Sequence, residues 1–120
     1  MTIALIVEDS LTDRTLLAGY LSQLGIQVTS VNSSEEALVS LETALPDLVF
    51  LDVVLPGQSG FEFCRDLKTS ENTKDIPIVI CSSKGTEADK LWGSMLGADL
   101  YLAKPINQQQ IEETIEQLVP

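Results

Sequence analysis

Short apolar runs of strand length recur along the chain, at residues 3–7, 26–31, 48–51, 76–81 and 100–103. Most are continuously apolar and do not alternate between apolar and polar positions. This is the pattern of parallel strands that are covered on both faces. The pattern therefore predicts five strands in one parallel sheet.

The segments between these runs carry helical signals. After the first run, apolar residues repeat at intervals of three and four. The repeating residues are Leu16, Leu17, Tyr20, Leu21 and Leu24. Gly25 follows them, at a position where glycine commonly ends a helix. Ser33 with Glu36, and Asn107 with Gln110, have the form of a capping box, so we expect helices to begin there.

Two further helices are expected over residues 59–69 and 86–96, where glycines weaken the pattern. Strands and helices then alternate with short connections, which is typical of an α/β fold with helices on both faces of the sheet. The sequence has no long linker, low-complexity tract or internal repeat. We therefore expect a doubly wound five-stranded parallel sheet in a single domain over residues 1–120, without an output domain.

The charge balance excludes one class of partner. The chain carries 18 acidic and 7 basic residues, for a net charge of −11. This charge is opposite in sign to a surface that neutralises nucleic-acid phosphates, so we expect no direct nucleic-acid binding. No apolar stretch approaches the roughly 18 residues that span a bilayer, and the first residues lack the basic region of a signal peptide. We expect a cytoplasmic protein without membrane insertion.

The residue types that the sequence lacks limit the reactions that its side chains can catalyse. Histidine is absent, and the two cysteines, Cys64 and Cys81, lack the spacing of a zinc or redox motif. We expect both thiols to be reduced and mostly buried. Without histidine there is no serine triad and no histidine acid or base, so chemistry must depend on carboxylates, hydroxyls and lysine.

Polar residues follow the predicted strands directly: Glu8 and Asp9, then Asp52, Ser82 and Lys104. The carboxyl ends of parallel strands meet at one edge of a sheet, where ligands of doubly wound folds bind. Each residue alone also has a structural explanation, as a helix-start acid, a strand-end hydroxyl or a surface lysine. Their joint occurrence at successive strand ends favours a functional site.

The acidic residues of this group point to a metal ion. Glu8, Asp9 and Asp52 would repel one another at the sheet edge unless a cation lay between them. Asp52 ends an apolar run, where an aspartate carries a high desolvation cost. Oxygen ligands without His or Cys favour a hard ion, and an incomplete protein shell favours Mg²⁺ over Ca²⁺. We therefore predict a Mg²⁺ site, with Mn²⁺ as a substitute.

An ordered set of motifs resembles the receiver domains of two-component response regulators. The motifs are Glu8-Asp9, Asp52 with Leu55-Pro56-Gly57-Gln58-Ser59-Gly60, Ile76-Pro77 before Ser82, and Gly97-Ala98-Asp99 before Tyr101-Leu102-Ala103-Lys104-Pro105. The resemblance covers essentially the whole chain. Trp92-Gly93 is similar to the same region of stand-alone receivers in chemotaxis-like and type IV pilus motility systems.

The resemblance implies a flavodoxin-like (βα)5 fold with strand order 2-1-3-4-5, and it implies roles for the site residues. Asp52 would be the phosphoacceptor and form a 4-aspartylphosphate. Mg²⁺ would be held by Glu8, Asp9, Asp52 and the backbone carbonyl of Val54. The phosphoryl group would come from a histidine kinase or a phosphotransfer protein. The chain would not be an enzyme, beyond intrinsic phosphotransfer and autodephosphorylation.

The resemblance also implies a switch. Ser82 would bond a phosphoryl oxygen, Lys104 would pair with Asp52 or the phosphoryl group, and Tyr101 would turn inward when Ser82 moves. The face formed by the fourth helix, fifth strand and fifth helix would then change its affinity for a downstream protein target. Tyr101 has an alternative explanation as an amphipathic residue at the sheet edge.

Some positions depart from the family's common pattern without removing a required chemical group. Glu8 replaces the commoner aspartate, Ser82 the commoner threonine, and Ile106 the frequent phenylalanine after the proline. Val54 and Lys84 occupy two positions that tune the phosphoryl lifetime in this family. Neither is suited to orient an attacking water, which predicts slow self-dephosphorylation.

Three other functions are weighed against this one. A metal-dependent phosphohydrolase shares the aspartyl-phosphate chemistry, but it requires an acid where Val54 stands. A flavodoxin-like cofactor binder requires a Gly-rich phosphate loop or aromatic flanks at the strand ends, and the sequence has neither. A pseudo-receiver would act only as an interaction module, and the complete set of acidic and hydroxyl residues argues against it.

Overall fold

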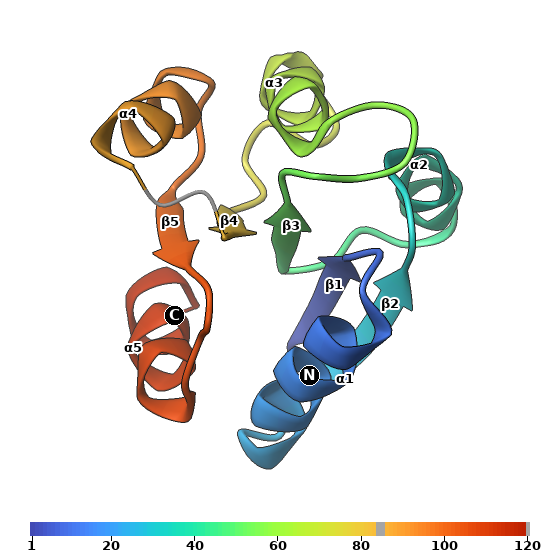
Figure 1. Ribbon diagram of the computed structural model, residues 1–120. Helices are drawn as coiled ribbons and strands as arrows, with labels where there is room; N and C mark the ends of the chain where they lie inside the picture. The colour runs from blue at the N-terminus through green and yellow to red at the C-terminus, as the bar shows by residue number, and fades with distance from the viewer. Residues whose placement is uncertain (84–85, 120) are drawn as a thin grey trace.

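Strands and helices alternate along the chain in the computed structural model, which describes residues 1–83 and 86–119 (Figure 1). The strands are β1 (Ile3–Val7), β2 (Gln27–Val31), β3 (Leu48–Asp52), β4 (Ile78–Ser82) and β5 (Leu100–Ala103). The helices are α1 (Leu11–Gln23), α2 (Ser34–Thr43), α3 (Gly60–Thr69), α4 (Glu87–Met95) and α5 (Gln108–Leu118). Within the described residues, no helix is long and apolar enough to cross a membrane.

All five strands pair in parallel, in the order β2-β1-β3-β4-β5. The central strands β3 and β4 are buried at every position, which explains their continuously apolar sequences. The register aligns the carboxyl ends of neighbouring strands, because Asp52 lies opposite Cys81 and Ser82 lies opposite Ala103. The predicted doubly wound parallel sheet and its strand order are therefore confirmed.

Helices cover both faces of the sheet. Figure 1 shows α1 and α5 on one face and α2, α3 and α4 on the other. Alternate residues of β1 point to opposite faces. Ala4 and Ile6 pack in the core under α1 and α5, whereas Leu5 and Val7 pack in the core under α2 and α3. Each strand therefore contributes to two separate apolar cores, and this fixes the sheet between its two helical layers.

The two cysteines lie in opposite cores. Cys64 packs under α3 and Cys81 packs on the α1 side, and both are buried free thiols. Burial raises the pKa of both thiols, that of Cys64 to about 11. Both therefore stay protonated near neutral pH, where the thiolate is the reactive form. The expectation of buried, unpaired cysteines is confirmed.

The first residues of two strands were predicted too early. β2 begins at Gln27 and not at residue 26, because the Ile26 N–H donates to the Leu21 carbonyl (3.1 Å) in the turn after α1. β4 begins at Ile78 and not at residue 76, because the Ile76 N–H donates to Thr73 (3.0 Å). Ile26 is still buried. An apolar run thus predicts burial, but the hydrogen-bonding partner decides where the strand begins.

Each described helix begins with a side-chain cap. The capping residues accept a hydrogen bond from the backbone N–H three residues later, and they are Ser10, Ser33, Ser59, Thr86 and Asn107. The predicted capping box of α5 is complete. The one predicted for α2 is not, because the Glu36 carboxylate accepts from Asn32 N (3.1 Å) instead of the Ser33 N–H. Every helix follows a strand end, so the positive ends of the helix dipoles gather at one edge of the sheet.

The opposite edge of the sheet is held by an ion pair. Asp99 accepts a hydrogen bond from the Ile78 N–H (2.7 Å) and pairs with Lys68 of α3 (2.9 Å). Lys68 also donates to the Ile76 carbonyl (2.9 Å). Gly97 has a φ of +99°, and a Cβ there would lie 2.8 Å from Lys68 Cγ. The Gly97-Ala98-Asp99 motif therefore joins α3, β4 and β5.

We expect Asp99→Ala to lower the free energy of unfolding by about 1–3 kcal/mol, because the Ile78 N–H loses its acceptor and Lys68 its anion. The melting temperature should fall by roughly 5–15 °C. Glu71→Ala is the matched control, since it removes an ion pair to Lys74 from a side chain that is 88% exposed. It should change stability little. Equal melting temperatures of the two variants would contradict this role of Asp99.

Candidate functional site

Polar residues at the ends of neighbouring strands gather at the carboxyl edge of the sheet. Glu8 directly follows β1, and its N–H donates to the Val31 carbonyl of β2 (3.1 Å). Asp52 and Ser82 are the last residues of β3 and β4. Lys104 follows β5, and its N–H donates to the Ser82 carbonyl (2.9 Å). The parallel register thus brings four of the predicted residues to one edge.

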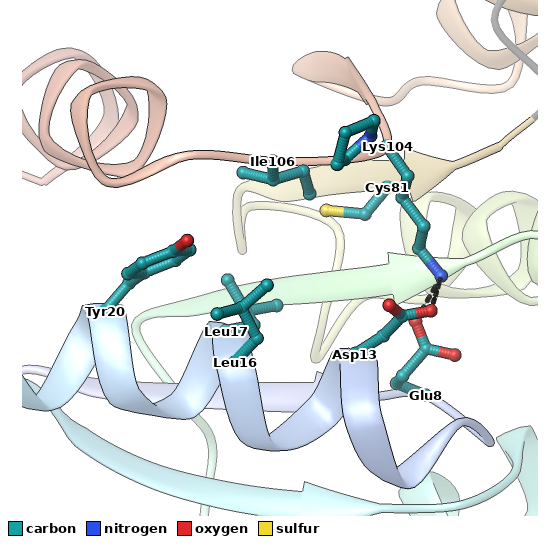
Figure 2. A pocket seen from close by; sticks show the side chains of 9 residues that line it. Glu8, Asp13, Leu16, Leu17, Tyr20, Cys81, Lys104 and Ile106 are labelled. Carbon is teal, nitrogen blue, oxygen red and sulfur yellow. Dashed lines mark hydrogen bonds and ion pairs between the residues drawn. The ribbon is translucent and has the colours of Figure 1, made fainter.

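The ammonium group of Lys104 is the centre of this cluster. Its Nζ lies 2.5 Å from Glu8 Oε1, 3.0 Å from Asp13 Oδ2 and 3.6 Å from Asp52 Oδ1. Figure 2 shows Glu8 and Asp13 converging on this nitrogen. Burial lowers the pKa of Lys104, but its hydrogen bonds to Glu8 and Asp13 outweigh burial and hold the pKa above its ordinary value. Lys104 therefore stays charged among the carboxylates.

Asp52 carries an unusual proton affinity. Only 8% of the residue is exposed, and 5% of Glu8. Burial and the adjacent Glu8 raise the pKa of Asp52 to about 6, although Lys104 and the Val53 N–H (2.9 Å) act in the opposite direction. The single lysine does not balance the buried carboxylates. The site therefore favours additional positive charge.

The donor set of this edge fits a hard divalent cation, since it offers buried carboxylate oxygens without histidine or thiolate. Asp9, however, is exposed and makes no side-chain hydrogen bond or ion pair within residues 1–83 and 86–119. In that part of the chain, no three acidic or cysteine side chains are arranged to hold a metal. The ligand set of Glu8, Asp9, Asp52 and the Val54 carbonyl stays a prediction.

Sequence reasoning missed Asp13. It occupies the third position of α1, where its N–H donates to the Ser10 side chain (3.3 Å). An acid at a helix start is usually explained by the helix dipole. The only sequence signal was this cap spacing close behind Glu8. Its contact with Lys104 joins residues at opposite ends of the chain and became visible only in the fold.

Ser82 and Tyr101 connect the acidic cluster to α4. Ser82 is fully buried. Burial raises the pKa of Tyr101, and a hydrogen bond with the Ser82 side chain opposes this effect. A Cβ at Gly93 of α4 would lie 3.1 Å from Tyr101 Cδ2 and 3.2 Å from Ile80 Cδ1. Glycine at this position therefore lets α4 lie close to the Tyr101 ring.

Glycines shape the loop between β3 and α3. A Cβ at Gly60 would lie 1.9 Å from the Asp52 carbonyl oxygen, and the Gly60 N–H donates to the Val53 carbonyl (2.9 Å). Gly57 has a φ of +74° and lies against the Glu35 carboxylate of α2. The loop therefore folds back tightly beside Asp52. Val54 in this loop is exposed, whereas Lys84, the second residue expected to tune phosphoryl lifetime, lies outside the described residues.

Fold and site together define a doubly wound α/β domain with a buried carboxylate pair and a lysine at the carboxyl edge of its sheet. The sequence matches the response regulator receiver domain over residues 4–116, and the chain therefore belongs to that family. The predicted family is confirmed. The chain is thus a receiver domain of the kind found in the response regulators of two-component systems.

Individual relatives agree with this assignment. Protein PilH of Pseudomonas aeruginosa is 36% identical over 111 residues, which cover 92% of this chain and 92% of PilH. The phosphate regulon transcriptional regulatory protein PhoB of Escherichia coli is 36% identical over 93% of this chain, and the match covers 49% of PhoB. The chain thus spans about half the length of PhoB and of several other curated relatives.

Solved structures have the same fold. The chemotaxis protein CheY4 of Vibrio cholerae has a TM-score of 0.91 and 28% identity, with 99% of each chain covered. The receiver domain of the sensor histidine kinase PA1611 from Pseudomonas aeruginosa has a TM-score of 0.88 and 26% identity, with 98% of this chain and 96% of that chain covered. That structure holds a magnesium ion in its active site cleft.

The raised pKa of Asp52 makes metal-free stability depend on pH. Because the folded-state pKa of about 6 exceeds the ordinary aspartate pKa of 3.8, protonation of Asp52 stabilises the fold below about pH 4, and this stabilisation is lost as pH rises through 6. Asp52→Asn should therefore raise the melting temperature at pH 8 in chelator by roughly 5–10 °C. The difference should disappear near pH 4.

Thermal unfolding monitored by circular dichroism between pH 4 and pH 8 measures this effect. Glu116→Gln on α5 removes the same formal charge from an exposed position, and it should show no such pH dependence. A lower melting temperature of Asp52→Asn than of wild type at pH 8 would show that the ionised carboxylate stabilises the metal-free fold, contrary to our expectation.

Proposed function

We propose that this receiver domain is a phosphorylation-dependent signalling switch in which Asp52 is the phosphoacceptor. The observation that carries the proposal is the placement of Asp52 at the end of a fully buried strand, 3.6 Å from Lys104 and beside Glu8. A buried carboxylate is costly unless it is paired or used. Asp52 is incompletely paired, because its pKa remains raised in spite of Lys104.

The chemistry is the transfer of a phosphoryl group from a phosphohistidine to Asp52. An Asp52 oxygen attacks phosphorus, the new O–P bond forms as the P–N bond breaks, and the imidazole leaves with the bonding electron pair. Lys104 then pairs with a phosphoryl oxygen, and the Ser82 hydroxyl donates a hydrogen bond to another. The reaction leaves the domain modified. Asp52 is therefore a phosphoacceptor, and the chain itself has only intrinsic phosphotransfer and dephosphorylation.

A divalent cation completes the site in this proposal. Glu8, Asp9, Asp52 and the Val54 carbonyl would hold Mg²⁺, or Mn²⁺ as a substitute, which would supply positive charge for the transferring phosphoryl oxygens. The buried, incompletely balanced pair of Glu8 and Asp52 supports this. The magnesium ion in the receiver domain of PA1611 supports it by analogy. Asp9 lies one residue beyond Glu8 and supplies the carboxylate that faces solvent.

The switch connects the phosphoryl group to α4. Ser82 moves toward the phosphoryl oxygen to which it donates a hydrogen bond. Tyr101 is the hydrogen-bonding partner of Ser82 and moves together with Ser82. Because the Tyr101 ring lies against Gly93, this movement changes the face formed by α4, β5 and α5. Leu91 and Met95 of α4 are 63% and 69% exposed, which gives this face an apolar surface for a protein target.

Partners and location follow from the same features. A histidine kinase or a phosphotransfer protein supplies the phosphoryl group, and a downstream protein binds the switched face. The net charge of −11 argues against direct nucleic-acid contact by this domain. The two free, buried thiols agree with a cytoplasmic location, where disulfides are rare.

A small phosphodonor tests the proposal directly. Acetyl phosphate should label the wild-type protein in the presence of Mg²⁺ or Mn²⁺, and chelator should abolish the labelling because the charge on the phosphoryl oxygens is no longer neutralised. The label should be hydroxylamine-labile, as an acyl phosphate is. Intact-mass spectrometry of wild type and Asp52→Asn measures this. Full labelling of Asp52→Asn, or labelling that chelator does not reduce, would refute the site assignment.

The switch can be followed through the single tryptophan, Trp92, which neighbours Gly93. Phosphorylation should change Trp92 fluorescence, because Tyr101 moves against Gly93. Tyr101→Ala should reduce this change at least several-fold while leaving the extent of labelling at Asp52 the same. Ile106→Ala, outside the Ser82–Tyr101–Gly93 contacts, is a control. An undiminished fluorescence change in Tyr101→Ala would show that Tyr101 does not connect Asp52 to α4.

A further inference from the structure

Asp13 and Asp52 compete for one lysine. The Lys104 ammonium group makes hydrogen bonds to Glu8 Oε1 and to Asp13 Oδ2 (3.0 Å). Its distance of 3.6 Å to Asp52 Oδ1 is that of an ion pair and not of a good hydrogen bond. Figure 2 shows the Lys104 side chain reaching across to α1, where Asp13 lies beside Glu8. In this state Lys104 is bound on the α1 side of the cluster.

Local structure fixes Asp13 for this contact. The Ser10 side chain caps α1 through the Asp13 N–H (3.3 Å), which sets the first turn of the helix. The Asp13 side chain is 42% exposed, so it remains hydrated while it contacts Lys104. Within residues 1–83 and 86–119, Lys104 is the only ion-pair or side-chain hydrogen-bond partner of its carboxylate.

Lys104 has space to move. A cavity of about 50 Å³ lies beside its side chain, between α1 and the segment after β5. Leu16, Leu17, Tyr20 and Ile106 line this cavity together with the charged group (Figure 2). Apart from Glu8 and Asp13, the residues that line the cavity are mostly apolar and include no other carboxylate. The position of Lys104 is therefore decided by the carboxylates, and Asp13 and Glu8 together hold it on the side away from Asp52.

We propose that Asp13 is a positioning residue for Lys104, which holds the ammonium group on the α1 side of the cluster and so leaves the Asp52 oxygens open to a divalent cation. This inference rests on the cation site in the proposed function. Without Asp13, Lys104 moves onto Asp52 and competes with the cation for the same oxygens. When Asp52 is phosphorylated, Lys104 leaves Asp13 for the phosphoryl group.

A direct effect of charge must be separated from positioning. The Asp13 carboxylate also attracts any nearby cation at long range, and this attraction does not require Lys104. Positioning does require Lys104. A double-mutant cycle separates the two effects, because independent charges give additive changes in affinity and a shared contact does not.

The experiment measures Mg²⁺ affinity by titration calorimetry for wild type, Asp13→Asn, Lys104→Met and the double variant. We expect Asp13→Asn to weaken Mg²⁺ binding roughly three- to ten-fold in the wild-type background. In the Lys104→Met background the same substitution should change affinity by less than about two-fold, because no ammonium group remains to be held. Asp13→Glu should restore most of the affinity.

Control variants distinguish a loss of positioning by Asp13 from a general effect of charge or of unfolding. Glu116→Gln removes one exposed negative charge from the last turns of α5 and should leave Mg²⁺ affinity nearly unchanged. Circular dichroism confirms that each variant is folded, and Asp13→Glu keeps the carboxylate if Asp13→Asn is unstable. Equal weakening in both backgrounds, or no weakening by Asp13→Asn, overturns the positioning role while the cation site stands. Absence of Mg²⁺ binding by wild type overturns the proposed function, and this inference with it.

Discussion

The burial of two carboxylates at the end of an apolar sheet is the constraint on which this site depends. Glu8 directly follows β1 and Asp52 ends β3, and neither strand has an exposed position, so their charges are removed from water and brought together. Desolvation and mutual repulsion both oppose ionisation. Lys104 offsets part of this cost from β5, and Asp13 shares the same lysine from α1. Because Lys104 does not fully balance the negative charge of the carboxylates, the site favours the binding of additional positive charge.

The two edges of the sheet differ in a way that suits a switch. At the amino edge of β4, Asp99, Lys68 and the backbone of Ile78 form a closed set of bonds that holds α3, β4 and β5 together. At the carboxyl edge, Lys104 is shared among competing carboxylates, and Ser82 and Tyr101 lie between this cluster and α4. In the proposed switch, a change of charge at Asp52 would act on Lys104, which already has three carboxylate partners.

Much of the fold followed from local patterns in the sequence. Continuous apolar runs predicted the strands because parallel strands are covered on both faces, and cap residues such as Ser33 and Asn107 marked helix starts. Asp52 could be singled out because a carboxylate at the end of an apolar run is costly wherever the chain folds. Parallel pairing then brought the strand ends that carry Asp52, Ser82 and Lys104 to one edge of the sheet, as their positions in the sequence had indicated.

Other features depended on contacts between distant segments, which no local pattern contains. In the sequence, Asp13 resembled an ordinary helix-start acid, yet the fold placed it against Lys104, 91 positions away. Gly93 weakened a predicted helix, and only packing showed that its missing side chain makes room for Tyr101. Asp9 stayed exposed while its neighbour Glu8 was buried. Sequence alone determined which residues must be buried or capped, because those costs are local. Tertiary structure decided which carboxylate each lysine contacts, because the strength of an ion pair depends on the distance between the charges in space.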